Sequence, residues 1–348
     1  MIHPYWQPAG KNLESQCRMF RTLLVTRSLD GHRREYVDQF RAIFSDKGLE
    51  VDVVSQGLGA LGVGDPVLFL MVEEDLFAYV GVSMLRGLTG RRTVGLLFRG
   101  QEAACGRALK LRVKRILLRM LKAVRGVTTL SIVPFDACPA LAMVADDCID
   151  DPQPWDLLDL KPPRTPLSEE VEQQAGNRKV VVSLGLQNPG KGVGFFMQAW
   201  QAEADLREDW LFVAAGRVSS DLAAEADSFR EAGGLVVDRF ITDAELRSLY
   251  GVATVIWGVY SPEYDQASGI FGRAVQFNRP IIVRKGSAVE RIAAGVSARA
   301  ASIEFGRSER LAEVLSNASA LDGGRASPAL MMRARSLKKI FDAMGIGQ

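Results

Sequence analysis

The sequence predicts an α/β protein built from two doubly wound parallel sheets that face each other across a cleft. Short apolar runs alternate with amphipathic stretches, this alternation occurs twice, and a proline-rich segment separates the two rounds. The chain has 348 residues, enough for two domains of ordinary size. We expect an N-terminal domain over residues 1–160, a C-terminal domain over 161–330, and a helix at about 330–348 that packs back on the first domain.

The first round begins with the apolar run 22–26, which reads as a buried strand leaving through a tight turn at Asp30-Gly31. A helix should follow from about Arg33, because large apolar residues recur there at helical spacing, and Gly48 should end it. The strands expected in this half are 22–26, 51–54, 66–72, 93–98 and 130–133.

Residues 146–177 hold five of the fourteen prolines, which is typical of a connection between domains. The second round follows this segment. Its expected strands are 180–183, 210–215, 235–237, 254–257 and 280–283, and its expected helices are 193–202, 220–232, 243–250 and 269–277.

Composition excludes several classes of protein. The 43 Lys and Arg nearly balance the 41 Asp and Glu, which argues against a nucleic-acid-binding protein. The four cysteines lack metal-binding or redox spacing, and we expect reduced thiols and no metal. No signal-peptide pattern opens the chain, and the longest apolar runs are far shorter than the roughly 20 residues of a membrane-spanning helix. We expect a cytoplasmic protein, at most peripheral on the inner face of the membrane.

Two glycine-rich segments resemble phosphate-binding loops. Gly57–Gly62 has the G-x-G-x-x-G spacing of dinucleotide sites, but no helix opens after it, so we predict a flexible turn. Gly185–Gly192 nearly matches the nucleotide-binding pattern G-x-x-x-x-G-K-[ST], between an expected strand and helix. Gly192 stands where that pattern needs a hydroxyl for Mg²⁺, which argues against an ATPase or GTPase. A metal-free diphosphate site and a turn with a solvated lysine both remain open.

The segments 236–250, 260–274 and 278–283, together with Pro189-Gly-Lys-Gly192, carry a resemblance that covers roughly residues 178–295. They resemble the nucleotide-sugar domain of GT-B glycosyltransferases, in particular the retaining family-4-like enzymes, whose two Rossmann-like domains face across a cleft. The resemblance implies transfer of a sugar from a UDP- or GDP-type donor, without another cofactor, to a glycan, lipid-linked or small-molecule acceptor. It also implies retention of the anomeric configuration and a place in bacterial polysaccharide or glycoconjugate synthesis.

The resemblance also implies roles for single residues. Gly190, Lys191, Ser268, Gly269 and Arg273 would bind the donor diphosphate. The donor sugar would be held by Glu263, Asp265, Gln266 and Arg99, with Asp265 at the first position of the family's paired acids.

Arg273 occupies the position of the second paired acid, so the charge there is reversed. The family's phosphate-binding arginine, expected five or six residues before Lys191, is replaced by Gly185 and Leu186. Either Arg273 replaces that arginine or the donor site is degraded.

On the acceptor side, the loop of Asp30, Gly31 and His32 follows the first strand at the sheet edge where ligands bind in doubly wound folds. His32 is a catalytic candidate beside Asp265, acting as a base or hydrogen-bond partner. A capping role for Asp30 and a surface position for His32 are the alternatives.

Between Arg86 and Arg125 there are twelve Lys or Arg and one acid, Glu102. Residues 107–125 read as an amphipathic helix with two stripes. The apolar stripe is Leu109, Val113, Ile116-Leu117, Met120-Leu121 and Val124, and the basic stripe is Arg112, Arg115, Arg119 and Lys122. This helix either lies on an anionic membrane surface or packs its apolar stripe into the core and leaves the basic stripe solvated.

Two other functions stay open. A non-catalytic GT-B binding or scaffold protein is suggested by Leu186 and Arg273, and a GT-B nucleotide-sugar epimerase is disfavoured because the chain has only two histidines.

Overall fold

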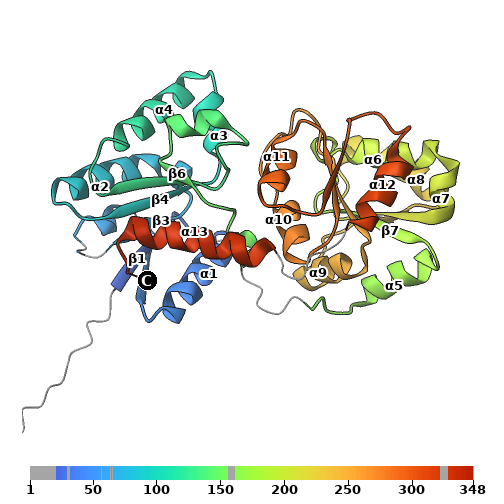
Figure 1. The fold of residues 1–348 in the computed structure, drawn as a ribbon, viewed down its shortest axis with the longest axis horizontal. Helices are drawn as coiled ribbons and strands as arrows, with labels where there is room; N and C mark the ends of the chain where they lie inside the picture. Colours follow the sequence, from blue (N-terminus) through green and yellow to red (C-terminus); the bar gives the residue numbers. More distant parts are fainter. Residues whose placement is uncertain are drawn as a thin grey trace, which may run out of the picture.

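The computed structural model describes residues 21–29, 32–55, 57–62, 64, 66–155, 161–321 and 328–347. The chain forms two lobes, each a parallel six-stranded sheet with helices against it (Figure 1). The predicted α/β architecture of two doubly wound units is confirmed.

The N-terminal sheet has the strand order β2-β1-β3-β4-β5-β6. Its strands are β1 (Arg21–Val25), β2 (Glu50–Val54), β3 (Val67–Phe69), β4 (Thr93–Leu97), β5 (Val127–Ser131) and β6 (Asp147–Cys148). Its helices are α1 (His32–Asp46), α2 (Leu76–Leu88), α3 (Gly100–Cys105) and α4 (Leu109–Leu121). β3 is shorter than predicted, because the chain turns at Met71, whose φ of 54° lies in the left-handed region.

The sequence pattern missed α2. Its outward face is apolar like its inward face, so it lacks the alternation of polar and apolar residues that indicates a surface helix. The predicted flexible turn at Gly57 is a short 3₁₀ helix, η1 (Gly57–Ala60). A Cβ atom at Gly57 would lie 2.6 Å from the Ala78 Cβ of α2, so this glycine serves close packing.

The C-terminal sheet has the order β12-β11-β10-β7-β8-β9. Its strands are β7 (Lys179–Leu184), β8 (Trp210–Ala215), β9 (Leu235–Val237), β10 (Val255–Gly258), β11 (Ile281–Arg284) and β12 (Ala300–Ile303). Its helices are α5 (Pro166–Ala175), α6 (Val193–Ala202), α7 (Ala204–Asp209), α8 (Ala223–Glu231), α9 (Asp243–Val252), α10 (Gly269–Gln276), α11 (Ala288–Gly295) and α12 (Leu311–Ala320). The buried β8 strand and helix α6 have the bounds that the sequence predicts.

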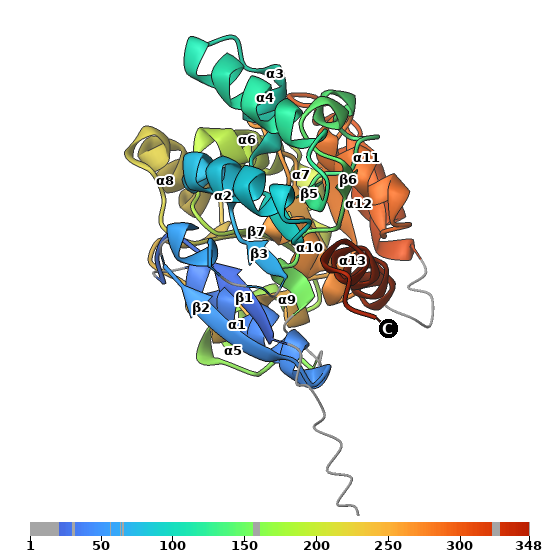
Figure 2. The same ribbon diagram turned by 90° about the vertical axis from the view of Figure 1, so that its left-hand side faces the viewer.

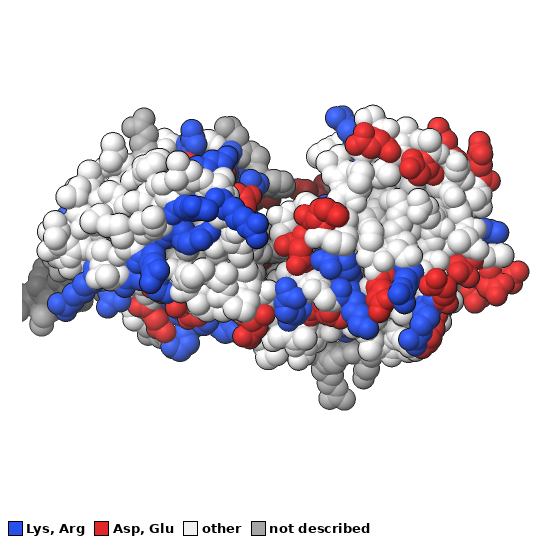
Figure 3. Space-filling view, turned by 90° about the horizontal axis from the view of Figure 1, so that it is seen from above, with Lys and Arg blue, Asp and Glu red and all other residues white. Residues whose placement is uncertain are grey.

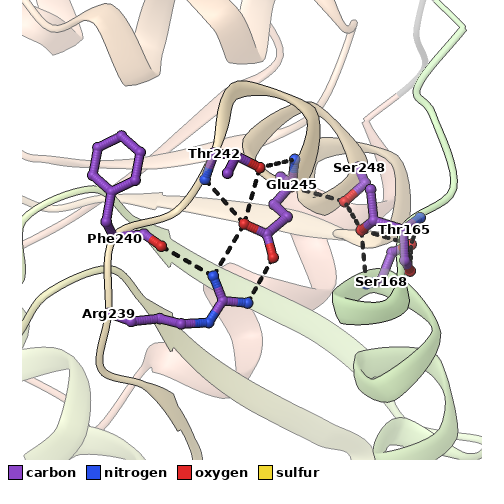
Figure 4. A network of polar contacts seen from close by, with 7 residues as sticks. All are labelled: Thr165, Ser168, Arg239, Phe240, Thr242, Glu245 and Ser248. Atoms are coloured by element: carbon purple, nitrogen blue, oxygen red, sulfur yellow. Dashed lines mark hydrogen bonds and ion pairs between the residues drawn. The ribbon is translucent and has the colours of Figure 1, made fainter.

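The proline-rich segment is more ordered than a plain connection. It contains β6, a 3₁₀ helix η4 (Gln153–Trp155) that buries Trp155, and helix α5. α5 is fastened to α9 by a hydrogen bond of 2.7 Å between the hydroxyls of Thr165 and Ser248 (Figure 4).

The last helix, α13 (Pro328–Met344), returns to the N-terminal lobe (Figures 1 and 2). There the buried Asp150 carboxylate accepts hydrogen bonds from Arg335 Nε and Nη2, at 2.7 and 2.6 Å, and from the Ser336 hydroxyl. No helix in the described ranges has the length and apolar content needed to cross a bilayer.

Candidate functional site

The Lys191 loop follows β7 at the carboxyl edge of the C-terminal sheet. Asn188 caps it by accepting a hydrogen bond from the Lys191 backbone N–H at 2.9 Å, and Gly190 accepts one from the Ser261 N–H at 3.0 Å. Gly192 has a φ of 68°, and a Cβ atom there would lie 1.9 Å from the Val259 carbonyl oxygen. The loop is therefore joined tightly to the segment that follows β10, and position 192 requires glycine.

The Lys191 side chain lies in an aromatic corner of that segment. Its Nζ is 4.6 Å from the ring centre of Tyr260 and 5.1 Å from that of Tyr264, within the range of cation–π contacts. Burial lowers the pKa of Lys191, and in the described part of the chain its ammonium has no carboxylate partner. A half-buried cation without an anion is a candidate anion-binding group.

Helix α10 begins beside this corner. The Ser268 hydroxyl accepts a hydrogen bond from the Phe271 N–H and pairs with the Tyr260 hydroxyl, so it acts as the N-cap. A Cβ atom on Gly269 would lie 2.0 Å from Gln153 Oε1, which places η4 of the N-terminal lobe against the first turn of α10. The helix N-terminus therefore faces the junction of the two lobes, where its dipole favours a negative charge.

The structure gives Asp265 a partner within the lobe. Its carboxylate accepts hydrogen bonds from Arg284 Nη2 at 3.0 Å and from the Ala288 N–H of α11 at 2.8 Å. Glu263 is exposed. Its pKa is lowered mainly by a hydrogen bond from its own backbone N–H and to a smaller extent by one from the Ser261 side chain. Gln266 lies in the same loop and is half-buried.

Arg273 lies one turn further along α10, where its Nη1 donates to Gln276 Oε1 at 2.8 Å. Its charge lowers the pKa of Asp151, although burial, the larger effect, raises that pKa overall. Asp151 also accepts a hydrogen bond from the Tyr36 hydroxyl of α1. The charge of Arg273 therefore acts on Asp151 across the lobe junction.

The sequence pattern missed a carboxylate on the N-terminal side. Glu73 accepts hydrogen bonds from the backbone N–H groups of Phe98 and Arg99, at 3.2 and 2.7 Å, which places Arg99 at the start of α3. Burial raises the pKa of Glu73. Glu73 lines a cavity of about 220 Å³. The other residues that line it are Glu35, Tyr36, Met71, Glu74, Phe98, Arg99 and Gln153.

Gln153 lines this cavity and also lies against Gly269 in the first turn of α10. The Glu73 cavity and the Lys191 corner therefore lie on either side of the junction between the two lobes. The three successive acids Glu73-Glu74-Asp75, directly after an apolar run, are a signal that sequence reasoning could have used. Asp30 and Gly31 lie outside the described residues, as does the side chain of His32, whose backbone begins α1.

A further missed feature lies at the carboxyl edge of β9. Arg239 and Glu245 form a two-bond ion pair, and Glu245 completes the capping box of Thr242 at the start of α9 (Figure 4). The Phe240 ring points away from this network and is 76% exposed. A rigid loop therefore presents an aromatic face to solvent.

In the described ranges no group of three or more His, Cys, Asp and Glu side chains is placed to hold a metal ion.

Comparison with solved structures identifies the fold. The Anabaena protein HepE, solved in complex with UDP, matches 93% of this chain over 100% of its own, with a TM-score of 0.61 and 12% identity. WaaG, a glycosyltransferase involved in lipopolysaccharide biosynthesis, matches 94% of this chain over 100% of its own, with a TM-score of 0.52 and 15% identity. The chain has the GT-B fold.

The catalytic domain of starch synthase IV from Arabidopsis thaliana, bound to ADP and acarbose, is a third GT-B match. It covers 92% of this chain and 99% of its own, with a TM-score of 0.53 and 10% identity. No known family profile and no curated protein sequence matches the chain. The GT-B assignment therefore depends on the arrangement of the two sheets and their helices.

Proposed function

We propose that the protein is a glycosyltransferase that takes its sugar from a nucleotide-diphosphate donor. The observation that carries the proposal is Lys191, a half-buried ammonium without a carboxylate partner in the described chain, beside the N-terminus of α10. A diphosphate is the ligand that this pairing of charge and backbone N–H groups favours. One GT-B neighbour, HepE, has been solved with UDP, with UDP and glucose, and with UDP-glucose, which supports a nucleotide-sugar donor.

The donor would lie along the carboxyl edge of the C-terminal sheet. Its diphosphate would contact Gly190, Lys191 and the Gly269 N–H, with Arg273 further along α10 as a second cation. Phe240 follows β9, which lies two strands from β7 in the sheet, so it lies about 10 Å from the Lys191 loop along the sheet edge. We assign the nucleobase, uracil or guanine, to stacking on Phe240, which has the exposed face that such a contact requires.

The sugar would then project toward the Glu73 cavity. The bond between the anomeric carbon and the diphosphate oxygen breaks, and its electron pair leaves with the diphosphate. A bond forms from the acceptor oxygen to the anomeric carbon, and the proton of that hydroxyl passes to the departing diphosphate, an arrangement that retains configuration. Glu73 would position the acceptor by accepting a hydrogen bond from a second, non-reacting hydroxyl of the acceptor, and Lys191 would stabilise the charge that develops on the diphosphate.

The acceptor classes are a glycan, a lipid-linked sugar or a small molecule, and we place the reaction in the cytoplasm, in polysaccharide or glycoconjugate synthesis. The transfer needs no metal in this proposal, because Lys191 and the α10 N-terminus supply the positive field. His32 remains an acceptor-side candidate in addition to Glu73. The sugar-binding candidates remain Glu263, Gln266 and Arg99. Asp265 remains a catalytic and sugar-binding candidate through its Oδ2 atom, while its Oδ1 atom holds the loop against α11 by accepting from Arg284 and the Ala288 N–H.

A specific observation favours a second function, a GT-B protein that binds a nucleotide sugar without transferring it. Both positions of the family's paired acids are engaged with protein groups, Asp265 with Arg284 and Arg273 with Gln276.

Calorimetric titration with UDP, GDP, UDP-glucose and GDP-mannose distinguishes the alternatives. Binding accompanied by slow release of UDP or GDP supports a transferase, and binding without turnover in the presence of cell-extract acceptors supports the second function. Absence of binding by all four nucleotides would refute both. Analysis of the anomeric product by NMR tests retention.

A further inference from the structure

Helix α4 presents apolar side chains to solvent. The stripe of Leu109, Val113, Ile116 and Met120 is exposed, with Leu109 at 77% and Ile116 at 59%. The helix is held to the lobe by the opposite face, which buries Leu118 and Leu121. The predicted apolar stripe is therefore divided: Leu117, Leu121 and Val124 pack against the core, whereas Leu109, Val113, Ile116 and Met120 do not.

Helix α2 adds a second exposed apolar face that the sequence did not reveal. Phe77, Met84, Leu85 and Leu88 are exposed, with Phe77 at 76% and Leu88 at 85%. α2 packs beside α4, and Gly87 closely approaches Val124 just beyond the end of α4. We call the eight side chains on these two helices the α2–α4 face. Surface this apolar is uncommon on a monomer unless it binds something.

The charges on the α4 side of the α2–α4 face are basic, whereas the acids Glu73, Glu74 and Asp75 precede Phe77 at its α2 side. On α4 itself, Lys110, Arg112 and Arg119 are exposed, and no acidic residue occurs between Gly106 and Arg125. Figure 3, which looks down on the side of the molecule where α4 lies in Figure 1, shows Lys and Arg gathered among white atoms on this lobe. Cations flanking exposed apolar side chains complement an anionic lipid surface.

A groove of about 570 Å³ adjoins this face, and its lining includes Leu58, Phe77, Lys114 of α4 and the acids Glu73, Glu74 and Asp75. Glu73 also lines the cavity beside the first turn of α10. A molecule anchored at the α2–α4 face would therefore reach the site where we place sugar transfer.

We propose that the α2–α4 face docks on an anionic membrane and that the acceptor is carried on a membrane lipid that enters along this groove. The acceptor part rests on the proposed transferase function, whereas the docking part does not. The inner face of the cytoplasmic membrane supplies the anionic surface.

Cosedimentation of the full chain with vesicles of phosphatidylcholine, with and without phosphatidylglycerol, tests the docking. We expect binding only when phosphatidylglycerol is present, and weaker binding at high salt. Phe77→Ser with Leu88→Ser should weaken binding at least about tenfold, because each side chain loses its transfer into lipid. Arg112→Gln with Arg119→Gln should weaken it about thirtyfold, or about fivefold for each cation.

Leu330→Ser with Met331→Ser on α13 is the matched control, because these two apolar residues are also exposed. It should bind vesicles as the unmodified protein does. Thermal unfolding and UDP titration of every variant show that the protein is folded and the donor site intact. Vesicle binding without binding of UDP, GDP, UDP-glucose or GDP-mannose would support docking and refute the transferase, which keeps the two failures distinguishable.

Equal binding by the Phe77/Leu88 variant and the control would overturn the docking. The docking would also be overturned if the protein bound no vesicles and formed a dimer in sedimentation velocity that the Phe77/Leu88 variant abolished, since a second copy would then cover the face.

A separate experiment tests the acceptor. The radiolabelled nucleotide sugar that calorimetry shows to bind is incubated with the protein and with vesicles of membrane lipid extract. Label in the organic phase supports a lipid acceptor, and label transferred only to water-soluble acceptors refutes it.

Discussion

Replacement of Lys191 by methionine is the sharpest test of the donor site. Methionine keeps the length of the side chain and removes its charge. Loss of a hydrogen bond from a charged group costs about 1.5–3 kcal/mol, so the Kd for UDP should rise about 10- to 150-fold. The free protein should change little in stability, because the lost cation–π contacts with Tyr260 and Tyr264 and the relieved burial of charge have opposite effects.

The pH dependence of this binding has a definite sign. Burial holds the pKa of Lys191 below its ordinary value in the free protein, and a bound diphosphate raises it by favouring the ammonium. UDP affinity should therefore be highest at pH values below the free-protein pKa and fall as the pH rises through it. The Lys191→Met protein should lack this fall.

Calorimetric titration with UDP from neutral to alkaline pH measures both effects. Lys179→Met is the matched control, since Lys179 Nζ lies 5.2 Å from the Trp210 ring centre but at the opposite end of β7. It should leave UDP binding unchanged. If Lys191→Met binds UDP within about threefold of the unmodified protein, well below the loss of one charged hydrogen bond, the diphosphate assignment is wrong.

Three further predictions concern the base, the acceptor and the α9 cap. Phe240→Ala should weaken UDP binding about 5- to 150-fold, which is the range for loss of one base–aromatic stack. Calorimetry should show that pyrophosphate binding is unchanged. An equal loss for UDP and pyrophosphate would show that Phe240 does not contact the base. Glu73→Gln should lower kcat/KM for the acceptor with little change in the donor Kd. It should also remove the acidic limb of the pH–rate profile, which reports the pKa of Glu73 that burial raises above its ordinary value. An unchanged profile would count against a positioning role. Hydrogen bonds from Arg239 and Thr242 lower the pKa of Glu245 to about 2, so the stability that Glu245 contributes is complete above its unfolded-state pKa of about 4.3 and is lost as pH falls toward 2. Glu245→Gln should flatten the dependence of Tm on pH in that window. An unaltered curve would contradict the assigned cap.

The regular elements of the C-terminal lobe were predictable because their signals are local. Buried strands such as Trp210–Ala215 are continuous apolar runs, and Thr242 and Glu245 form a capping box that marks the start of α9 from sequence alone. Helix α2 was not predictable in this way, because an apolar solvent face removes the periodic contrast on which helix recognition depends.

The candidate site was only partly predictable, since its groups come from segments distant in the sequence. Lys191 and the α10 N-terminus were recognised from a loop and a resemblance, and the structure places both loops side by side through the Gly190–Ser261 hydrogen bond. The influence of Arg273 on Asp151 could not be predicted from the sequence, because Asp151 lies 122 residues earlier in the chain and approaches only when the lobes meet. Glu73 was missed because its burial depends on the loop between β4 and α3.

The contact between Gly192 and Val259 separates this loop from the nucleotide-binding loops that it resembles in sequence. Those loops carry a hydroxyl for magnesium at the corresponding position. Here any Cβ atom would overlap the Val259 carbonyl oxygen. The loop therefore could not acquire a metal-holding hydroxyl by point substitution without parting from the strand beside it, so the two kinds of phosphate site are separated by backbone geometry as well as by one side chain.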